Sequence, residues 1–352
     1  MSDRLNREST FPTEIVKELG KRGFLGMTIS PDYGGMGVDN VAYSITVEEI
    51  SRVCASTGVI VSVNNSLVCH PLNKYGNDEQ KKKYLTPLAS GVKLGSFGLT
   101  EPGAGTDVSS LQSTAVKEGD EYIINGSKTF ITNGPNSDTF IVFAATDKEA
   151  RHKGISAFIM DRESQGFDAN SIAPKLGIHA SSTADLAFDN VRVPTENLLG
   201  NLGDGFKISM NTLDGGRIGI ASQALGIAQA SLDHTLSFLD SDDGPTRLSK
   251  KQSIQHKVAD MATEIEAARL LVYKAAFTKD TKDRYSEEAA MAKLHAANTA
   301  MKVSSWAFEI MGSRANLEKN MVERYLRDAK ITEIYEGTSE VQRMVIAAAR
   351  LR

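Results

Sequence analysis

The sequence predicts an α+β protein with an N-terminal α-helical domain, a middle antiparallel β domain of barrel or sandwich type, and a C-terminal bundle of long helices. Apolar residues recur with a helical period up to residue 93 and alternate with a period of two over 94–203. From residue 204 the helical period returns in longer elements. We therefore expect three domains, at residues 1–93, 94–203 and 204–352.

The N-terminal part contains an amphipathic helix and a long apolar segment. Residues 11–23, FPTEIVKELGKRG, place Ile15, Val16 and Leu19 on one helical face and end at a glycine. Residues 58–72, GVIVSVNNSLVCHPL, are so apolar that we expect them to be buried. Further helices are expected over 41–56 and 77–90.

The middle part contains short strands without helices between them. Runs such as EYIING, TFIVFAATD and ADLAFDNVRVP carry β-branched and aromatic residues and are bounded by Gly, Asn and Asp. Because no helix separates neighbouring strands, an antiparallel barrel or sandwich is favoured over a parallel βαβ sheet. Asn125-Gly126, between EYII and SKTFIT, predicts a hairpin turn.

The C-terminal part predicts a helical bundle. In residues 252–279, Ile254, Val258 and Met261 begin an apolar series with spacings of three and four. Residues 217–239 are rich in small side chains, so this helix can pack closely against its neighbours. Further helices are expected over 285–312, 318–331 and 338–350.

Composition and charge exclude several functional classes. Hydrophobic residues make up 41% and charged residues 24% of the chain, and the formal net charge is −4. The sequence has no basic stripe of the kind that nucleic-acid binders carry, and no apolar run approaches the roughly 20 residues of a membrane span. Cys54 and Cys69 form no metal-binding pair and the histidines form no ligand motif, so we expect no metal. Cysteine usage and a polar N-terminus predict a cytoplasmic protein, or a mature mitochondrial matrix chain in a eukaryote.

The segment LTEPGAGTD, residues 99–107, follows a predicted strand. Such a loop can turn backbone N–H groups and a hydroxyl toward a phosphate or a planar ring. It is not a P-loop, because no Gly-Lys-Ser/Thr follows, and it lacks the βαβ setting of a dinucleotide fingerprint. By composition alone it is a tight structural loop.

Other motifs also have a structural interpretation. KTFITNG by itself indicates a barrel strand with Phe130 in the core. In KLGIHASSTADLAF, Ser181 and its neighbours could donate to a phosphate or amide, or form only a hydroxyl-rich loop. In LDGGRIG, Asp214 is placed as an N-cap and Arg217 in the first helical turn, where a cation is disfavoured and needs a structural or ligand partner.

The stretch ITEIYEGTSEVQR holds three carboxylates, Glu333, Glu336 and Glu340, before a predicted last helix. Composition allows either a solvated acidic turn or a site at which one of these carboxylates does chemistry.

The order of the motifs is more specific than any one of them. TEPGAGTD, FITN, GIHASST, LDGGRIGIASQALGIAQ and RDAKITEIYEGTSEVQR resemble the acyl-CoA dehydrogenase family over residues 12–350. EEISRVCASTGVIVSVNNSL and RIGIASQALGIAQ are most similar to its short-chain, butyryl-CoA branch. The resemblance implies FAD-dependent desaturation of an acyl-CoA thioester, with hydride passing from C3 to flavin N5.

The resemblance implies that Glu336 is the base that takes the C2 proton. Some branches carry this glutamate where Gly216 stands here, so the base is not duplicated. Removing such a weakly acidic proton needs a carboxylate in a dry pocket and donors at the thioester carbonyl, here the Glu336 N–H and a ribityl hydroxyl of FAD by resemblance. The implied FAD contacts are Phe97, Leu99, Thr100, Thr106, Phe130, Ile131, Thr132, Thr338 and Glu340. The implied acyl-CoA contacts are Thr106, Ser181, Asp214, Arg217 and Gly337.

The sequence departs from the family pattern where neighbouring subunits contact FAD. Asp242 stands about where the family has an arginine, and a carboxylate cannot replace a guanidinium as a pyrophosphate partner. Arg247 offers a guanidinium in a different register. Glu309, Ser313 and Ala315 stand in place of a glutamine and two glycines. The family's first helix, of roughly two dozen residues, is also absent from this sequence. The resemblance implies a homo-oligomer, and because these departures touch subunit contacts, one interpretation is that its assembly is altered.

These departures leave three functions open. The first is a FAD-dependent short-chain acyl-CoA dehydrogenase, with acyl-CoA as substrate and an electron-transferring flavoprotein as acceptor. The second is a scaffold that binds acyl-CoA with weak or no FAD and little activity. The third is an oxidase or an enoyl-CoA reductase on the same fold.

Overall fold

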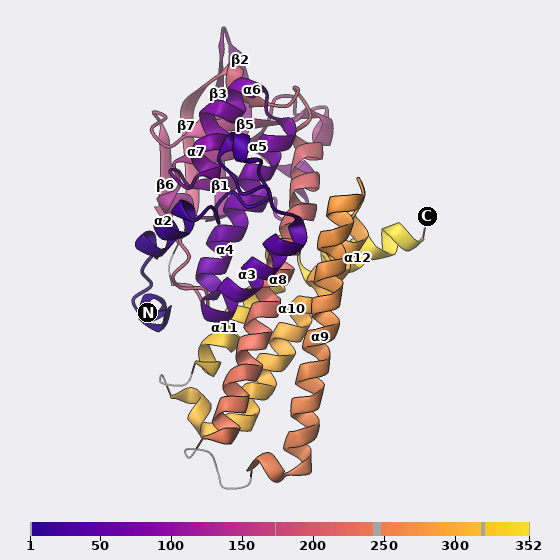
Figure 1. Ribbon diagram of the computed structural model, residues 1–352. Helices are drawn as coiled ribbons and strands as arrows, with labels where there is room; N and C mark the ends of the chain where they lie inside the picture. Colours follow the sequence, from indigo (N-terminus) through magenta and orange to yellow (C-terminus); the bar gives the residue numbers. More distant parts are fainter. Residues whose placement is uncertain (1, 173, 242–247, 318–320, 352) are drawn as a thin grey trace.

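The computed structural model describes residues 2–351 apart from 173, 242–247 and 318–320. Helices form both ends of the chain and strands form the middle. The sheet and the N-terminal helices lie at one end of the molecule, and the long C-terminal helices extend away from them (Figure 1). The predicted α+β class, with helical, β and helical parts, is confirmed.

The N-terminal part is helical, and its apolar segment is buried. Its helices are α1 (Ser2–Arg7), α2 (Thr13–Lys21), α3 (Asn40–Val53), α4 (Ala55–Val63), α5 (His70–Tyr75), α6 (Asp78–Gln80) and α7 (Thr86–Ala89). The helix α2 forms over the predicted amphipathic stretch. Residues 58–69 are all buried and continue from α4 through a π-helical turn at Asn64–Cys69 into α5, which confirms the predicted buried segment.

The middle part forms one sheet of mainly antiparallel strands. These are β1 (Gly95–Gly98), β2 (Thr114–Glu118), β3 (Glu121–Thr132), β4 (Thr139–Ala145), β5 (Ile155–Asp161), β6 (Phe167–Ser171), β7 (Thr183–Pro194) and β8 (Leu198–Leu199). Their order is β6-β7-β3-β2-β4-β5-β8, and β1 pairs with β4 off this path. Neighbours in that order are antiparallel except β2 and β4, and β1 is parallel to β4.

The predicted hairpin at Asn125-Gly126 is wrong. Both residues lie inside β3, where the pairing with β7 passes through a β-bulge. Gly126 has a φ of +140°, and a side chain there would collide with Ser113. The glycine therefore permits a bulge and a close strand approach. The turn between β2 and β3 is made by Gly119 and Asp120 instead.

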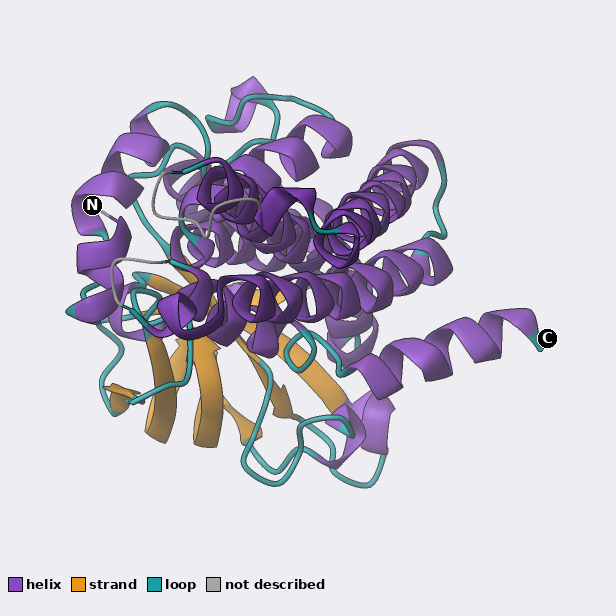
Figure 2. Ribbon diagram, turned by 90° about the horizontal axis from the view of Figure 1, so that it is seen from below, coloured by secondary structure: helices purple, strands orange, loops and turns teal. Residues whose placement is uncertain are grey.

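The C-terminal part is a bundle of long helices. They are α8 (Gly205–Asp240), α9 (Gln252–Thr281), α10 (Ser286–Met311), α11 (Val322–Thr332) and α12 (Ser339–Arg350). The small residues of α8 are buried along most of its length, between α3 and α10, which confirms the predicted close packing. The predicted start of the α11 helix at residue 318 lies outside the described residues. The helix α12 projects away from the bundle (Figure 2).

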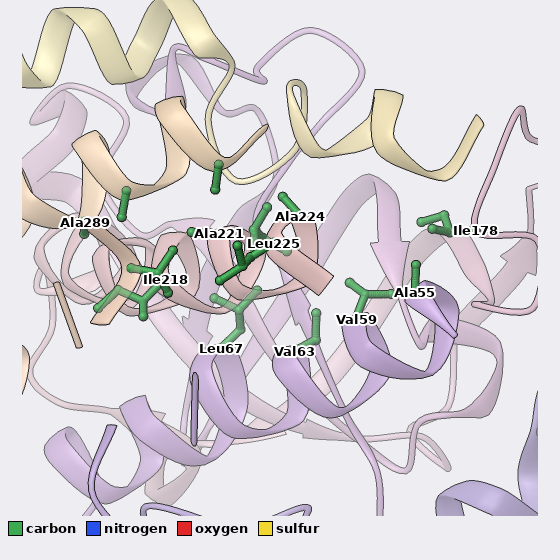
Figure 3. Close-up of a cluster of buried hydrophobic side chains, with 14 of the residues drawn as sticks. Ala55, Val59, Val63, Leu67, Ile178, Ile218, Ala221, Ala224, Leu225 and Ala289 are labelled. Carbon is green, nitrogen blue, oxygen red and sulfur yellow. The ribbon is translucent and has the colours of Figure 1, made fainter. Parts of the chain in front are cut away.

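An apolar core holds α8 against the N-terminal helices. Figure 3 shows Val59 and Val63 of α4 and Leu67 of the π-helical turn on the side of α8 that carries Ile218 and Ala221. All five side chains are buried in one cluster. Because this core is shared, α8 and the segment around Leu67 form a fixed wall beside the candidate site.

Candidate active site

The candidate base lies in the turn between α11 and α12. Glu336 has a φ of +52° and Gly337 a φ of +93°, so the backbone is left-handed twice in succession. Positive φ is uncommon outside glycine, and surrounding contacts must hold it. The Gln342 amide on α12 donates to the carbonyl oxygens of Glu336 at 3.3 Å and Gly337 at 2.8 Å. The turn is therefore fixed by the helix that follows it.

The three glutamates of this stretch have different surroundings. Glu333 pairs with Lys330 at 2.8 Å, and Glu340 is exposed in the first turn of α12. Glu336 Oε2 is buried and has no hydrogen-bond partner among the described residues. A buried carboxylate oxygen left unpaired is unfavourable and points to a functional role. Glu336 is thus the glutamate available for chemistry.

The Glu336 carboxylate lies against α8 at Gly216. A β-carbon on Gly216 would overlap Glu336 Oε2, and it would stand 2.9 Å from Glu336 Cδ and 2.7 Å from Leu67 Cδ2. Any larger residue at Gly216 would therefore displace the carboxylate. Because Gly216 has no side chain, α8 leaves the space that the Glu336 carboxylate occupies.

Two buried cations oppose the effect of burial on Glu336. Burial raises the pKa of Glu336 to about 8, against the attraction of Lys293 and Arg217. Lys293 on α10 is fully buried, and its Nζ donates to the Gly337 carbonyl at 2.7 Å. Burial lowers the pKa of Lys293 to about 8, against the attraction of Glu336. A carboxylate whose pKa lies near working pH is suited to taking a proton.

Lys293 is a site residue that the sequence predictions did not include. Its signal was a single lysine inside the alanine-rich run AAMAKLHAA, at a position whose neighbours are small enough to be buried. A lone lysine on a buried helical face needs an acceptor, but which acceptor it meets depends on how α10 lies beside the turn before α12.

Asp214 and Arg217 form a buried ion pair in the interior of α8. The helix begins at Gly205, so the prediction that Asp214 is an N-cap and Arg217 lies in the first turn is wrong. The apolar residues before Asp214 extended the helix by two turns. The Arg217 guanidinium donates to Asp214, and the Ser286 hydroxyl donates to the other Asp214 oxygen. Arg217 Nε remains buried and unpartnered within the described chain.

The loop 99–107 is anchored by a buried ion pair that the sequence predictions missed. Glu101 accepts hydrogen bonds from Lys128 Nζ at 2.7 Å and from the backbone N–H of Ser113 at 3.0 Å. Lys128 and Glu101 are both buried. A side chain added at Gly103 or Gly105 would meet nothing within 4 Å. The acidic residue thus faces the protein, and the glycines face open space.

Phe130 is exposed, so the prediction that it is a core residue is wrong. It is 68% exposed and has a φ of +58°, at an irregularity in the pairing of β3 with β7. The strained backbone turns the ring out of the sheet, next to Thr129, whose N–H donates to the Thr100 carbonyl at 2.8 Å. An outward ring beside an open glycine loop is suited to contact with a planar group. Among the other predicted FAD contacts, Phe97, Leu99 and Ile131 are buried, Thr100, Thr132 and Thr338 are half-buried, and Thr106 is exposed.

Residues 175–183 connect the strand side of the site to the helical side. The Asn133 N–H after β3 donates to the Ser182 carbonyl at 2.9 Å, and the Ile178 N–H donates to Asp328 of α11 at 2.5 Å. The hydroxyl oxygens of Ser181 and Ser182 are buried, with no partner in the described part of the chain. These hydroxyls are free to bond a ligand.

The structure groups the predicted residues into two walls. Arg217, Asp214 and Gly337 gather around Glu336 on the helical side, and Thr100 and Phe130 share the strand side. Of the residues that depart from the family pattern, Asp242 and Arg247 lie outside the described residues. Glu309 is exposed and pairs with Lys257, Ser313 is exposed, and Ala315 is buried.

Over residues 2–351 with the gaps given above, the side chains form no group of three or more His, Cys, Asp and Glu that could hold a metal ion. Within the same residues, every helix is too short or too polar to cross a membrane.

Comparison with protein families gives a match over nearly the whole chain. The N-terminal domain of acyl-CoA dehydrogenases matches residues 1–92, their middle domain matches 96–191, and their C-terminal domain matches 203–351.

The chain is also similar to individual relatives and solved structures. It is 51% identical over 350 residues to the mitochondrial short-chain specific acyl-CoA dehydrogenase of Mus musculus, covering 99% of this chain and 85% of that protein. It is 50% identical to the short-chain specific acyl-CoA dehydrogenase of Clostridium acetobutylicum, covering 99% and 92%. Butyryl-CoA dehydrogenase from Megasphaera elsdenii superposes with a TM-score of 0.96 at 45% identity, covering 99% and 93%. A chain from a structure described as the electron transferring flavoprotein of Acidaminococcus fermentans gives 0.98 at 48%, covering 99% and 92%.

Proposed function

This chain belongs to the acyl-CoA dehydrogenase family, and we propose that it desaturates short-chain acyl-CoA thioesters between C2 and C3 with FAD as its cofactor. One structural observation carries the proposal: the buried, unpaired carboxylate of Glu336, held against Gly216 with a raised pKa. The names of relatives near 50% identity support the short-chain assignment.

Glu336 takes the proton from C2 of the acyl group. The reaction removes a weakly acidic proton, so the base gains strength when water is excluded and its charge is poorly solvated. Burial raises the pKa of Glu336 to about 8. Lys293 and Arg217 keep part of the carboxylate ionised at neutral pH, because each stabilises its negative charge.

The backbone at Glu336 also offers a donor to the thioester carbonyl. Within the described part of the chain, the Glu336 N–H donates to no protein acceptor. This N–H lies in a turn that two side chains hold in place. Gln342 donates to the carbonyl oxygens of Glu336 and Gly337, and Lys293 donates to that of Gly337. A donor that is already oriented stabilises the negative charge that develops on the carbonyl oxygen as the proton leaves.

The residues on the strand side fit FAD. Phe130 presents an exposed ring, and the open faces of Gly103 and Gly105 leave room for a planar or phosphate-bearing group. Thr100 and Thr132 would provide hydroxyls beside that ring. The chemistry that bound FAD supplies is acceptance of the hydride lost from C3. Glu101 and Lys128 hold the loop shape on which these contacts depend.

Arg217, Asp214 and Ser181 would bind the coenzyme A part of the substrate. Arg217 Nε and the Ser181 hydroxyl are buried donors that lack a protein acceptor in the described residues. Asp214 is occupied by Arg217 and Ser286, so it acts by orienting the guanidinium. The predicted roles of Thr106, Thr338, Glu340 and Gly337 are retained in the proposal.

The proposal is tested with purified protein under anaerobic conditions. Protein as isolated, or after incubation with FAD, is expected to show stoichiometric flavin absorbance that butyryl-CoA bleaches. Glu336→Gln is the matched control: it keeps the shape of the side chain, should bind FAD as the wild type does, and should neither bleach nor exchange the C2 proton. Bound FAD that butyryl-CoA fails to bleach in the wild type would overturn the proposal.

The same assay separates the alternative functions. Colourless protein that still binds butyryl-CoA after incubation with FAD would identify an acyl-CoA-binding scaffold. Rapid peroxide release in air would identify an oxidase. Reduction of crotonyl-CoA without measurable oxidation of butyryl-CoA would identify an enoyl-CoA reductase.

The acceptor, the assembly and the compartment are parts of the same proposal. We infer an electron-transferring flavoprotein as the acceptor, tested by flavin reoxidation on mixing with such a protein. We infer a homo-oligomer, tested by light scattering of the FAD-loaded protein. We infer a cytoplasmic chain, or a matrix chain in a eukaryote, tested by fractionation of the source cells.

A further inference from the structure

The strand β3 carries a bulge at the point where the ring of Phe130 turns outward. The register of its pairing with β7 shifts between Lys128 and Ile131. Two residues of β3, Thr129 and Phe130, therefore oppose the single residue Asp185 of β7. A bulge of this kind re-aims a side chain, and bulges are common next to active sites.

The packing of the Phe130 ring does not set its direction. The ring belongs to none of the buried apolar clusters or aromatic pairs of the described residues, and it is 68% exposed. Its backbone has a φ of +58°, and a strained conformation of this kind persists only where surrounding contacts hold it. Those contacts must come from the neighbouring residues of the bulge.

Thr129 makes two such contacts in different directions. Its N–H donates to the Thr100 carbonyl at 2.8 Å, which ties the bulge to the loop 99–107. Its hydroxyl donates to the Asp185 carboxylate at 2.5 Å, which ties the bulge to the opposing strand. The Thr129 side chain is buried, and a hydrogen bond to a carboxylate is stronger than one between neutral groups.

The two residues before the ring hold the same loop. Lys128 Nζ donates to Glu101 at 2.7 Å, one residue after the Thr100 carbonyl that Thr129 bonds. The bulge is therefore fixed on the loop by two successive residues and on β7 by Asp185, and only the Phe130 ring is left free to contact a ligand. In the described part of the chain, Asp185 bonds no donor side chain other than the Thr129 hydroxyl, so its carboxylate is not shared with a cation.

We propose that Thr129 and Asp185 are positioning residues for the cofactor side of the site. Their hydrogen bond closes the bulge and fixes the direction of the Phe130 ring relative to the loop 99–107. This inference deepens the proposed function and rests on it, because the ring and the loop are the groups proposed to contact FAD. Without the bond, the strained φ of Phe130 loses one of the contacts that hold it, so the ring no longer has one fixed direction.

The first test measures FAD binding to the full-length protein by titration, together with the absorption and circular dichroism of the bound flavin. Thr129→Val keeps the shape of the side chain and removes the hydroxyl. It should weaken FAD binding about tenfold, the loss expected for one hydrogen bond to a charged group. The flavin bands should also change, because they report the groups that lie against the flavin ring. Thr129→Ser keeps a hydroxyl and should bind FAD as the wild type does.

Two further variants separate the pair from a general loss of stability. Asp185→Ala should weaken FAD binding as Thr129→Val does, and the double variant should be no weaker than either, because the two side chains act through one bond. Thr139→Val is the matched control. This threonine is buried in β4 of the same sheet, and its hydroxyl bonds no group in the described residues, so its removal should leave FAD binding unchanged.

Kinetics show on which wall the pair acts. The rate of flavin reduction at saturating butyryl-CoA should fall several-fold in Thr129→Val. The KM for butyryl-CoA and the acidic limb of the kcat/KM profile should stay as in the wild type, because Glu336 and the proposed coenzyme A contacts lie on the helical wall. A general disturbance of the fold would change all three.

A last measurement does not need the cofactor. In protein stripped of FAD, residues 99–107 and 126–133 should exchange their amide hydrogens faster in Thr129→Val and Asp185→Ala than in the wild type and Thr139→Val, because the bulge opens more readily. Wild-type FAD affinity, flavin spectrum and amide exchange in both variants would overturn the inference, and so would losses that add in the double variant. If Thr129→Val does not fold, Asp185→Ala decides, because that side chain is exposed.

Failure of this inference and failure of the dehydrogenase proposal are separate results. Bound flavin that butyryl-CoA does not bleach in the wild type would overturn the dehydrogenase proposal, while FAD affinity and amide exchange would still report the role of Thr129 and Asp185. Bleaching at the wild-type rate with unaltered FAD affinity in both variants would remove that role and leave the dehydrogenase proposal intact.

Discussion

Replacing Gly216 by alanine should displace the proposed base while changing no group that takes part in the chemistry. The added β-carbon would overlap Glu336 Oε2 and stand 2.9 Å from Glu336 Cδ, whereas ordinary contacts begin at 3.4 Å. The Cδ atom must therefore move by at least 3.4 − 2.9 = 0.5 Å, and the overlapped oxygen by more. Leu67 Cδ2, at 2.7 Å from the same point, limits movement in another direction.

The magnitude follows from the size of this displacement. A misplacement of about 1 Å in a reacting group costs roughly 10²-fold in rate. We therefore expect Gly216→Ala to lower the rate of flavin reduction by about one to two orders of magnitude. Overpacking should cost about 1–3 kcal/mol, while alanine's helix propensity returns about 1 kcal/mol, so the protein should remain folded.

The assay is anaerobic rapid mixing of FAD-loaded protein with saturating butyryl-CoA, together with thermal unfolding. Gly215→Ala is the matched control for stability, because its β-carbon would come close only to the end of the flexible Lys279 side chain, at 3.1 Å, and would meet the Tyr285 hydroxyl at an ordinary contact distance of 3.7 Å. It should gain about 1 kcal/mol from helix propensity. Flavin reduction at the wild-type rate in Gly216→Ala would refute the claim that α8 sets the position of the carboxylate.

Three further predictions concern charge. The kcat/KM of the wild type should fall about tenfold per pH unit below the raised pKa of Glu336, near 8, because only the ionised carboxylate takes a proton. The free energy of unfolding should also fall as pH rises from about 4 to 8, because the folded state keeps a proton on Glu336 that the unfolded chain releases. Glu336→Gln should remove this pH dependence of stability in denaturant titrations. Lys293→Met should move the acidic limb of the kcat/KM profile to higher pH, because a positive charge near the base is lost, and Lys293→Arg should restore it; an unshifted limb in Lys293→Met would contradict this. Lys128→Met should cost about 3–5 kcal/mol in urea unfolding and weaken FAD binding, since it leaves the buried Glu101 carboxylate without its counter-ion. Adding Glu101→Gln should recover part of the loss, and additive losses would argue against the pairing.

The sequence predicted the order of helical and β parts because apolar periodicity is a local signal that tertiary contacts did not override here. The hairpin signal at Asn125-Gly126 failed for a tertiary reason. Asparagine followed by glycine usually indicates a turn, but this glycine is required where β3 passes close to Ser113. The same dipeptide is suited to a hairpin turn and to a bulge within a strand, and only the pairing of the strands shows which of the two forms.

The candidate site could also be predicted only in part, because its geometry depends on contacts between residues that are distant in sequence. The motif predicted Glu336 as the base, and what distinguishes it from Glu333 and Glu340 in the structure is a buried carboxylate oxygen without a partner in the described residues, which depends on α8 lying against the turn. Lys293 and the Lys128–Glu101 pair were missed because each joins residues distant in sequence. A buried lysine can be suspected from its apolar neighbours, but its acceptor is known only from the fold.

The segment 175–183 connects the two walls of the candidate site. It is hydrogen-bonded to the end of β3 through Ser182 and to α11 through Ile178. In the proposed reaction a proton leaves toward Glu336 and a hydride toward the flavin on the strand side, so the distance between the two walls matters as much as the groups that line them. The number of residues in this segment should influence that distance. Inserting or deleting one residue there should lower the rate of flavin reduction, although every catalytic group would still be present in the sequence.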